Sequence, residues 1–366
     1  MLKIYGFVAE FNPFHNGHKL FIDSIKQKYH PDVLIAVMSG NFVQRGDFAI
    51  LDKWDRAKLA IDFGVDLVVE LPMAYAVEPA ELFAQGSVNL LHLLGINNLV
   101  FGTENQVDFT SMTQKILQAD KTFQQDYQKS FAANLTDYYQ SIGIDIAKLP
   151  NQLLGLNYVL QIQQQQYDIK IKTIQRQKND FSATKIRQNL VDHQDIFSLA
   201  PKQTIATLEK SQLVMWEDYF PFLKYQILNS STQELHGIYQ MVEGLENKFQ
   251  KEILTSQNFD QFVEQVKSKR YTMARLRRLM LYTLLNVHES EINNVYKNPY
   301  LRILGFDEIG QRYLKTLKKT EAKLITRVGR NQQQTLDLEI RADRIRQLIS
   351  GQEENFGKIP YMKGVN

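Results

Sequence analysis

Short apolar runs alternate with amphipathic stretches through the first half of the chain. The apolar runs have the length of buried strands, and they are IYGFVA (4–9), VLIAVM (33–38), DLVVEL (66–71), NLVFG (98–102) and IKIKTI (169–174). Between them, segments such as HKLFIDSIKQKY and DKWDRAKLAIDFG have the spacing of helices with one apolar face. This alternation predicts an α/β fold with a mostly parallel sheet and crossover helices. In such sheets, ligands bind beyond the carboxyl ends of the strands.

Helical spacing dominates the second half of the chain. In YTMARLRRLMLYTLLN, for example, Leu276, Met280 and Leu284 recur at i, i+4 and i+8. We therefore predict two domains, an α/β domain over residues 1–197 and an all-helical domain over residues 198–366.

Composition narrows the class of protein. The chain has 366 residues, 44% hydrophobic and 23% charged, which is ordinary for a globular protein. No apolar run approaches the roughly 18 residues that span a bilayer, and the first strand carries Lys3 and Glu10 rather than a signal-peptide pattern. We expect a cytoplasmic protein. The absence of cysteine excludes disulfides, thiolate zinc sites and a thioester mechanism.

The stretch NPFHNGH lies between the first predicted strand and the first predicted helix. A helix N-terminus has unpaired N–H groups and a partial positive charge, and together these bind phosphate. Gly17 lets the backbone approach a ligand without interference from a Cβ atom, and Asn12 or Asn16 can cap the helix. His15 and His18 are one helical turn apart, so both imidazoles can donate hydrogen bonds to phosphate oxygens. The stretch is therefore a candidate phosphate site.

Two other interpretations of this stretch stay open on local grounds. Taken alone, it is most simply a strand–turn–helix junction with one capping asparagine and two surface histidines. Metal binding has weaker support, because Glu10 is the one nearby carboxylate and no cysteine completes a ligand set. The chain contains no Walker A sequence and no GxG pair, so no other phosphate-binding signature competes with HNGH.

A second candidate phosphate loop is FSATKIR, Phe181 to Arg187, just after the last predicted strand. Ser182 is a good N-cap, so the loop opens another helix, and Lys185 and Arg187 add positive charge. By itself such a loop is usually a capped basic helix. A strand followed by H-x-G-H, paired with S-x-T-x-I-R late in the same domain, resembles the signatures of HIGH-type nucleotidyltransferases and class I aminoacyl-tRNA synthetases.

The resemblance extends over most of the chain. The stretches that carry it are GFVAEFNPFHNGH, SGNFVQRGDFAILDKWDRAKLAI, ELP (70–72), FGTE (101–104), PNQLLGLNY (150–158), SATKIR, YTMARLRRLMLY and LRILGF (301–306). They are similar to the tRNA(Met) cytidine acetate ligase family. The resemblance implies a Rossmann-like, HUP-type nucleotidyltransferase domain followed by a helical tRNA-binding domain. It also implies an ATP-dependent ligase that activates acetate as acetyl-adenylate, releases pyrophosphate and AMP, and forms N4-acetylcytidine at the wobble position of elongator tRNA(Met).

The resemblance further implies which residues act. His15, His18 and Lys185 would be catalytic, with the histidines stabilising charge on the α-phosphate. Mg²⁺ would arrive with ATP, without a dedicated protein site. Residues implied for ATP binding are Phe7, Val8, Ala9, Glu10, Phe11, Asn12, Pro13, Phe14, His15, Asn16, Gly17, His18, Lys19, Leu20, Gly102, Asn151, Arg176, Ser182 and Lys185. Lys185 and Arg187 would hold the β- and γ-phosphates, and the loop SGNFVQRGDF (39–48), with Arg45, is a candidate lid.

Clustered positive charge indicates where RNA would bind, although the net charge of +3 is mild. The first cluster contains no acidic residue and consists of Lys267, Lys269, Arg270, Arg275, Arg277 and Arg278. The second cluster has Glu321 among its basic residues Arg312, Lys315, Lys318, Lys319, Lys323, Arg327 and Arg330. Such runs suit a phosphate backbone, although a basic run is often just a solvated helix face. We assign tRNA binding to the first cluster.

Two other functions compete with the ligase. A small-molecule adenylyltransferase or cytidylyltransferase would share both phosphate motifs, but such enzymes are usually compact single domains. A non-catalytic RNA-binding protein that senses nucleotides would not need two histidines aimed at the α-phosphate.

Overall fold

The structure is a computed structural model that describes residues 2–105, 107–120, 123, 126, 129–145, 150–176, 181–317 and 323–364, without the side chains of residues 132, 150 and 151. Within these ranges, no helix is long and apolar enough to cross a membrane.

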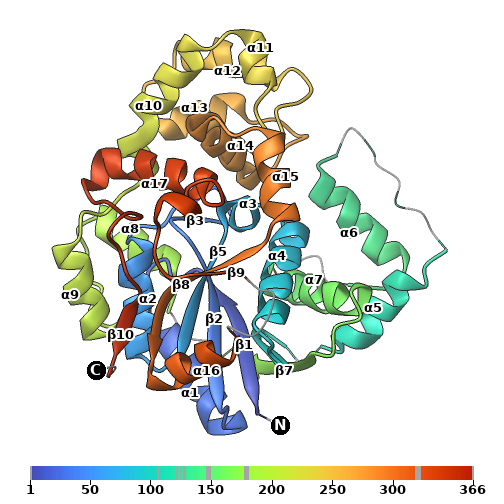
Figure 1. The fold of residues 1–366 in the computed structure, drawn as a ribbon. Coiled ribbons are helices and arrows are strands. Elements are labelled where there is room, and N and C mark those ends of the chain that lie inside the picture. The colour runs from blue at the N-terminus through green and yellow to red at the C-terminus, as the bar shows by residue number, and fades with distance from the viewer. Residues whose placement is uncertain are drawn as a thin grey trace.

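A mixed, mostly parallel sheet organises the molecule (Figure 1). Its strands run in the order β10-β8-β5-β2-β1-β6-β7, and β9 pairs with β8. All neighbouring pairs are parallel except β5 with β8. The strands are β1 (Ile4–Ala9), β2 (Val33–Ser39), β5 (Leu67–Leu71), β6 (Asn98–Thr103), β7 (Lys170–Gln175), β8 (Tyr300–Asp307), β9 (Lys323–Ile325) and β10 (Tyr361–Lys363). A separate hairpin consists of β3 (Phe42–Val43) and β4 (Asp47–Phe48).

Helices cover both faces of this sheet, which is why β2 and β5 are buried at every residue and apolar except at Ser39 and Glu70. One apolar cluster joins the sheet to α1 and α2, and the other joins it to α4 and α7. The helices up to β7 and just after it are α1 (Asn16–Tyr29), α2 (Lys53–Asp62), α3 (Met73–Ala76), α4 (Ala80–Leu93), α5 (Phe109–Leu117), α6 (Phe131–Ser141), α7 (Pro150–Gln164) and α8 (Ala183–Val191). The predicted α/β class with a mostly parallel sheet is confirmed.

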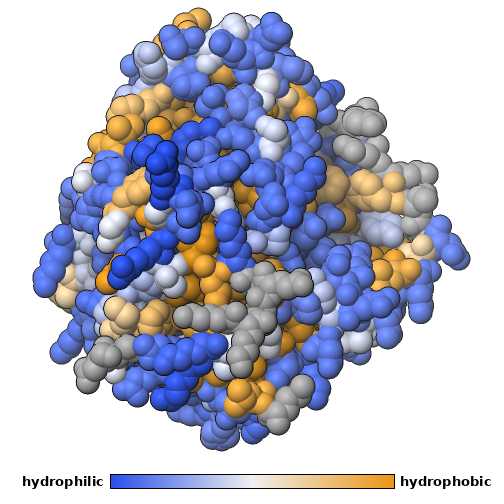
Figure 2. All heavy atoms as spheres, viewed as in Figure 1, coloured by the Kyte–Doolittle hydropathy of each residue, from blue (hydrophilic) through white to orange (hydrophobic). Residues whose placement is uncertain are grey.

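A run of helices follows, and all but the first, which packs beside α2, lie beyond the carboxyl ends of the central strands (Figure 1). These helices are α9 (Lys202–Lys210), α10 (Trp216–Asn229), α11 (Thr232–His236), α12 (Leu245–Ile253), α13 (Phe259–Val266), α14 (Met273–Leu285) and α15 (Glu289–Lys297). Polar side chains dominate the face shown in Figure 2, with an apolar patch near α10, where Phe222, Tyr225 and Leu228 are exposed. The predicted helical C-terminal region is confirmed for this part of the chain.

The prediction that everything after residue 198 is helical was wrong. After α15 the chain returns to the sheet as β8, and it continues through α16 (Glu308–Leu317), β9, the 3₁₀ turn Arg330–Gln332, α17 (Asp337–Ser350) and β10. The run LRILGF lies in β8, which is paired on both sides and buried along nearly its whole length. In a strand that is buried along its length, apolar and polar residues do not alternate. This short apolar run therefore could not be distinguished from the helical segments that precede it.

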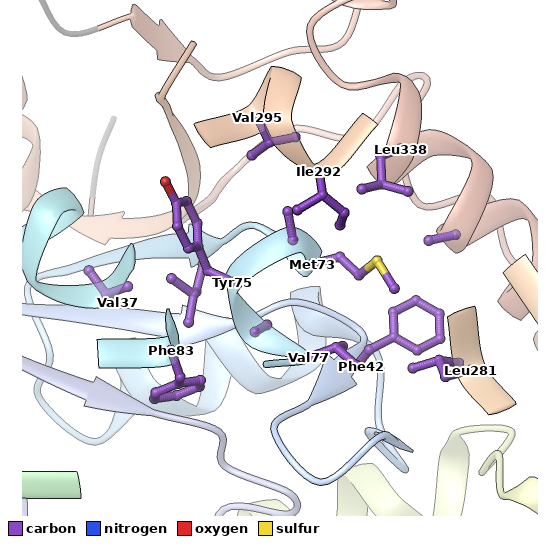
Figure 3. Packing of buried hydrophobic residues seen from close by; sticks show 14 of the residues in the cluster. Val37, Phe42, Met73, Tyr75, Val77, Phe83, Leu281, Ile292, Val295 and Leu338 are labelled. Atoms are coloured by element: carbon purple, nitrogen blue, oxygen red, sulfur yellow. The ribbon is translucent and has the colours of Figure 1, made fainter. Parts of the chain in front are cut away.

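The helices α14, α15 and α17 share one core with the α/β part. Figure 3 shows Met73 of α3 and Val77, which directly follows α3, among apolar side chains of these helices, including Leu281, Ile292 and Leu338. This packing fixes the helical region above the edge of the sheet where the strands end. The division at residues 197 and 198 stays a prediction.

Candidate active site

A pocket of about 470 Å³ opens at the carboxyl ends of β1 and β6. These two strands are neighbours, but the chain continues from β1 to β2 on one side and from β6 to β7 on the other. The crossover connections therefore diverge at this point and leave a crevice, which is where doubly wound sheets bind nucleotides. The end of β1, the start of α1, Gly102 of β6 and the start of α8 all contribute to its lining.

The N-terminus of α1 is capped by a histidine. His15 Nδ1 accepts a hydrogen bond from Gly17 N at 3.0 Å, and His18 Nδ1 accepts one from His15 N at 3.2 Å. The expectation that Asn12 or Asn16 caps this helix was therefore wrong. Asn12 instead accepts from Ile50 N, and Asn16 donates to Ser198 O, so both amides fix neighbouring loops.

Because both Nδ1 atoms accept from the backbone, each imidazole carries its proton on Nε2. The rings stack with centroids 3.7 Å apart. Burial, together with the smaller effect of the Arg176 charge, lowers the pKa of His15 to about 4. Burial also lowers the pKa of His18 well below its usual value, with His15 and Arg176 adding to the effect. Near pH 7 both side chains are neutral hydrogen-bond donors at the edge of the pocket.

The second phosphate loop also opens a helix at this pocket. Ser182 Oγ caps α8 by accepting from Lys185 N at 3.4 Å, as the sequence predicts. Thr184 and Arg187 line the pocket, whereas Ser182 and the exposed Lys185 side chain lie outside its lining. Arg187 donates to Asn12 O at 2.6 Å, which joins the two loops directly.

The other residues expected to bind ATP divide into three groups. Those that line the pocket are Phe7, Val8, Ala9, Glu10, Phe11, Asn12, His15, Gly17, His18, Leu20, Gly102 and Arg176. Those outside the lining, besides Ser182 and Lys185, are Pro13, Phe14, Asn16 and Lys19. Phe14 is buried and stacks on Phe63, while Lys19 pairs with Asp23 at 2.6 Å. The side chain of Asn151 lies outside the described residues.

One wall of the pocket consists of residues that no sequence pattern indicates. Phe83 of α4, Phe101 of β6, and Leu154 and Tyr158 of α7 form this wall. Apolar side chains on helices and strands are normally read as core, and only the fold shows that these face a cavity. Among the described residues, no group of three or more histidine, aspartate or glutamate side chains is placed to hold a metal ion.

The candidate lid, residues 39–48, contains the β3–β4 hairpin, and Val43, Gln44, Arg45 and Asp47 line the pocket. The helical region holds this hairpin. Trp216 Nε1 donates to Gly46 O at 2.9 Å.

The first basic cluster runs from this hairpin to the surface. Arg277 pairs with Asp47 at 3.2 Å, and Arg278 is buried and donates to Gln44 O at 3.4 Å. The remaining members differ in exposure: Lys267, Lys269 and Arg270 are exposed, and Arg275 is half-buried over the Tyr271 ring. Arg277 and Arg278 are therefore held by the hairpin, while Lys267 and Arg270 form exposed pairs with Glu264 and Glu243 at 3.3 and 3.9 Å.

In the second basic cluster, five side chains are exposed: Arg312, Lys315, Lys323, Arg327 and Arg330. Lys318, Lys319 and Glu321 lie outside the described residues.

Comparison with known proteins agrees with this geometry. A family model described as HIGH Nucleotidyl Transferase matches residues 2–358. The tRNA(Met) cytidine acetate ligase of Lactobacillus gasseri is 39% identical, with 98% of this chain and 99% of that protein covered. The ligase of the same name from Listeria monocytogenes is 37% identical, with 95% of each chain covered.

The fold matches a solved structure over almost the whole chain. The crystal structure of Thermotoga maritima TmcAL bound with alpha-thio ATP superposes with a TM-score of 0.87 at 28% identity, with 99% of both chains covered. The chain therefore belongs to the HIGH nucleotidyl transferase family and, within it, to the tRNA(Met) cytidine acetate ligases.

Proposed function

We propose that this protein is an ATP-dependent ligase that acetylates N4 of the wobble cytidine of elongator tRNA(Met). The observation that carries the proposal is the pairing of two capped helix N-termini, those of α1 and α8, at one pocket. The positive dipole ends of both helices lie at the same space, which suits a triphosphate. The first N–H groups of α1 are already bonded to Leu199 O, His15 Nδ1 and His15 O, so at this helix the dipole and the histidine side chains carry the phosphate affinity.

In the first step, an acetate oxygen attacks the α-phosphorus of ATP, and pyrophosphate leaves. The Nε2–H groups of His15 and His18 donate to the oxygens on which charge develops. Fixed donors in a partly buried site need no reorganisation during the reaction, so they stabilise the transition state more than water would.

The remaining phosphate contacts come from α8. We assign Lys185 and Arg187 to the β- and γ-phosphates, because α8 begins beside the pocket and Arg187 already lies in its lining. Mg²⁺ would enter as part of the ATP substrate, held chiefly by phosphate oxygens. Gly102, Arg176, Ser182 and Asn151 complete our ATP assignment. At Gly102, a Cβ atom would approach Arg176 Cγ to 3.2 Å, so a side chain there would crowd the pocket.

In the second step, the cytidine N4 attacks the carbonyl carbon of acetyl-adenylate, and AMP leaves. The base must be unstacked to reach the pocket, which a single-stranded anticodon loop allows. The first basic cluster supports RNA binding beside the hairpin, since it leads from Arg277, the partner of pocket residue Asp47, to exposed Lys267, Lys269 and Arg270.

The full reaction is tested with purified protein, ATP, Mg²⁺ and labelled acetate, with and without tRNA. Label that appears as N4-acetylcytidine in tRNA(Met) is the expected result. ATP consumption that depends on neither acetate nor tRNA would contradict the proposal. The alternative of a small-molecule nucleotidyltransferase predicts a released nucleotidyl product, and the full-length similarity to acetate ligases does not support it.

The tRNA surface is tested by removing exposed charge. We predict that changing Lys267, Lys269 and Arg270 together to glutamine weakens tRNA binding and reduces the slope of log K against log salt by about 2, since each lost phosphate contact contributes about 0.7 to 0.9. Filter binding at several salt concentrations measures this, and acetate-dependent ATP–pyrophosphate exchange should stay unchanged. An unaltered slope would place the tRNA elsewhere.

A further inference from the structure

The transfer step needs a group that the phosphate-binding residues do not supply. When the cytidine N4 bonds to the carbonyl carbon, that nitrogen gains a positive charge and must lose a proton. AMP departs with the electron pair of the broken C–O bond. A base beside the reacting centre would remove the proton as the new bond forms.

The two histidines cannot be this base. Each Nδ1 accepts a backbone N–H, so each Nε2 already carries a proton and has no free lone pair. Arg45, Arg176 and Arg187, which also line the pocket, are donors with no acceptor site.

Two carboxylates line the pocket, Glu10 and Asp47. Asp47 is engaged by Arg277, whose Nη1 lies 3.2 Å from both carboxylate oxygens. Glu10 directly follows β1, at the point where the crossover connections diverge. Its Oε1 accepts from Gln44 N at 2.8 Å, and among the described residues no hydrogen bond is found for its Oε2.

We propose that Glu10 is the base that accepts the N4 proton of the target cytidine during acetyl transfer. The inference rests on the proposed function, since it assigns a residue to its second step. The N4–C bond forms, the bond from carbon to the AMP oxygen breaks, and the proton passes from N4 to Glu10. The carboxylic acid then returns the proton to solvent after the products leave.

The surroundings of Glu10 suit this role. Burial raises the pKa of this carboxyl, while the Gln44 N–H and the charges of Arg187, Arg45 and Arg56 lower it in part. A desolvated carboxylate is a stronger base than one in water. Tyr158 and Asp47 are the other titratable groups that face this end of the pocket, besides the two neutral histidines.

The test separates the two half-reactions. Glu10→Gln retains an oxygen that can accept from Gln44 N–H but cannot take a proton. Single-turnover transfer from enzyme-bound acetyl-adenylate to tRNA should fall at least about 100-fold. Acetate-dependent ATP–pyrophosphate exchange, to which Glu10 contributes only as one residue of the pocket lining, should fall much less. The wild-type transfer rate should rise with pH as Glu10 ionises and then level off, and the variant should lack this acidic limb.

Glu10→Asp serves as the conservative variant. It keeps a carboxylate one methylene farther from the centre, so transfer should recover in part and the acidic limb should return. Wild-type transfer by Glu10→Gln would overturn the proposal and leave the AMP phosphate or water as the proton acceptor. Equal loss of both half-reactions would also overturn it, because Glu10 would then position ATP. A wild-type protein that forms no acetyl-adenylate would refute the proposed function instead.

Discussion

At the scale of single residues, the two ring nitrogens of His18 have different tasks. Nδ1 accepts from His15 N and so completes the cap of α1, while in the proposed function Nε2–H donates to the substrate. Asparagine places an oxygen near the position of Nδ1 but has no equivalent of Nε2–H. We predict that His18→Asn lowers acetate-dependent ATP–pyrophosphate exchange by about 100- to 1,000-fold, the usual effect of losing one transition-state donor. Its melting temperature should remain close to that of wild type.

His18→Ala is the matched variant for this prediction. It loses both the cap and the donor, so it should show the same loss of exchange and an additional destabilisation of about 1 kcal/mol. Exchange at the wild-type rate in either variant would remove His18 from the phosphate site. Neither change touches the basic cluster, so tRNA binding should persist in both.

The site residues that could be predicted from the sequence are those whose role depends on their neighbours in the chain. His15, His18 and Ser182 stand at the start of helices, where capping rules and phosphate affinity depend on a few adjacent residues. Phe83 and Tyr158 reach the pocket from helices far apart in sequence, so their function depends on packing. Even the cap itself was misassigned, because histidine is seldom an N-cap and asparagine usually is.

At the scale of elements, the β3–β4 hairpin connects the pocket to α14. Gly46 has φ +75°, and a Cβ atom there would lie 2.3 Å from Arg278 N, a contact with backbone that cannot move away cheaply. We predict that Gly46→Ala destabilises the protein and shifts the hairpin residues Gln44 and Asp47 away from the pocket. Thermal unfolding and the KM for ATP measure the two effects, and both should worsen.

Gly357→Ala is the control for the backbone conformation. Gly357 has φ +76°, and nothing lies within 4 Å of its would-be Cβ. Both variants carry the cost of about 1 kcal/mol for a left-handed alanine, but only Gly46→Ala adds the clash. If the two variants unfold at the same temperature and bind ATP alike, the hairpin is not held by close approach to α14.

The order of the elements also shows which strands could be predicted from the sequence and which could not. The parallel strands β1, β2, β5, β6 and β7 follow from their apolar runs and the helical segments between them. The strand β8 does not, because its partner β5 lies more than 200 residues earlier in the chain and runs antiparallel to it. The residues in and around Tyr300–Asp307 do not indicate which strand β8 will pair with. The return of the chain to the sheet therefore depends on tertiary packing.

At the scale of the whole molecule, a buried network of charges joins the first and last parts of the chain. Lys53 of α2 lies 2.8 Å from Glu70 of β5 and 2.6 Å from Asp343 of α17. Arg302 of β8 approaches Glu70 at 3.4 Å, and Asn41, just before the hairpin, donates to Asp343 at 2.8 Å. The network therefore fixes α17 and β8 against the segment that shapes the pocket.

Removing one charged residue from such a network leaves its former partners buried with an unpaired charge. Lys53 is fully buried and contacts two carboxylates, so Lys53→Met would keep the volume of the side chain and remove its charge. We predict that this change lowers the free energy of unfolding by about 3 to 5 kcal/mol. Urea denaturation measures the loss, and the slope of the transition should stay the same if the folded and unfolded states keep their compactness.

An exposed ion pair, Lys129 with Asp137, is the control for this prediction. Lys129 and Asp137 also approach to 2.8 Å, but both side chains are about half exposed to solvent. Since water screens and solvates such charges, Lys129→Met should leave the urea midpoint unchanged within error. If Lys53→Met were equally harmless, the network would not hold the C-terminal helix in place. The pocket would then depend on the apolar core alone to join the two ends of the chain.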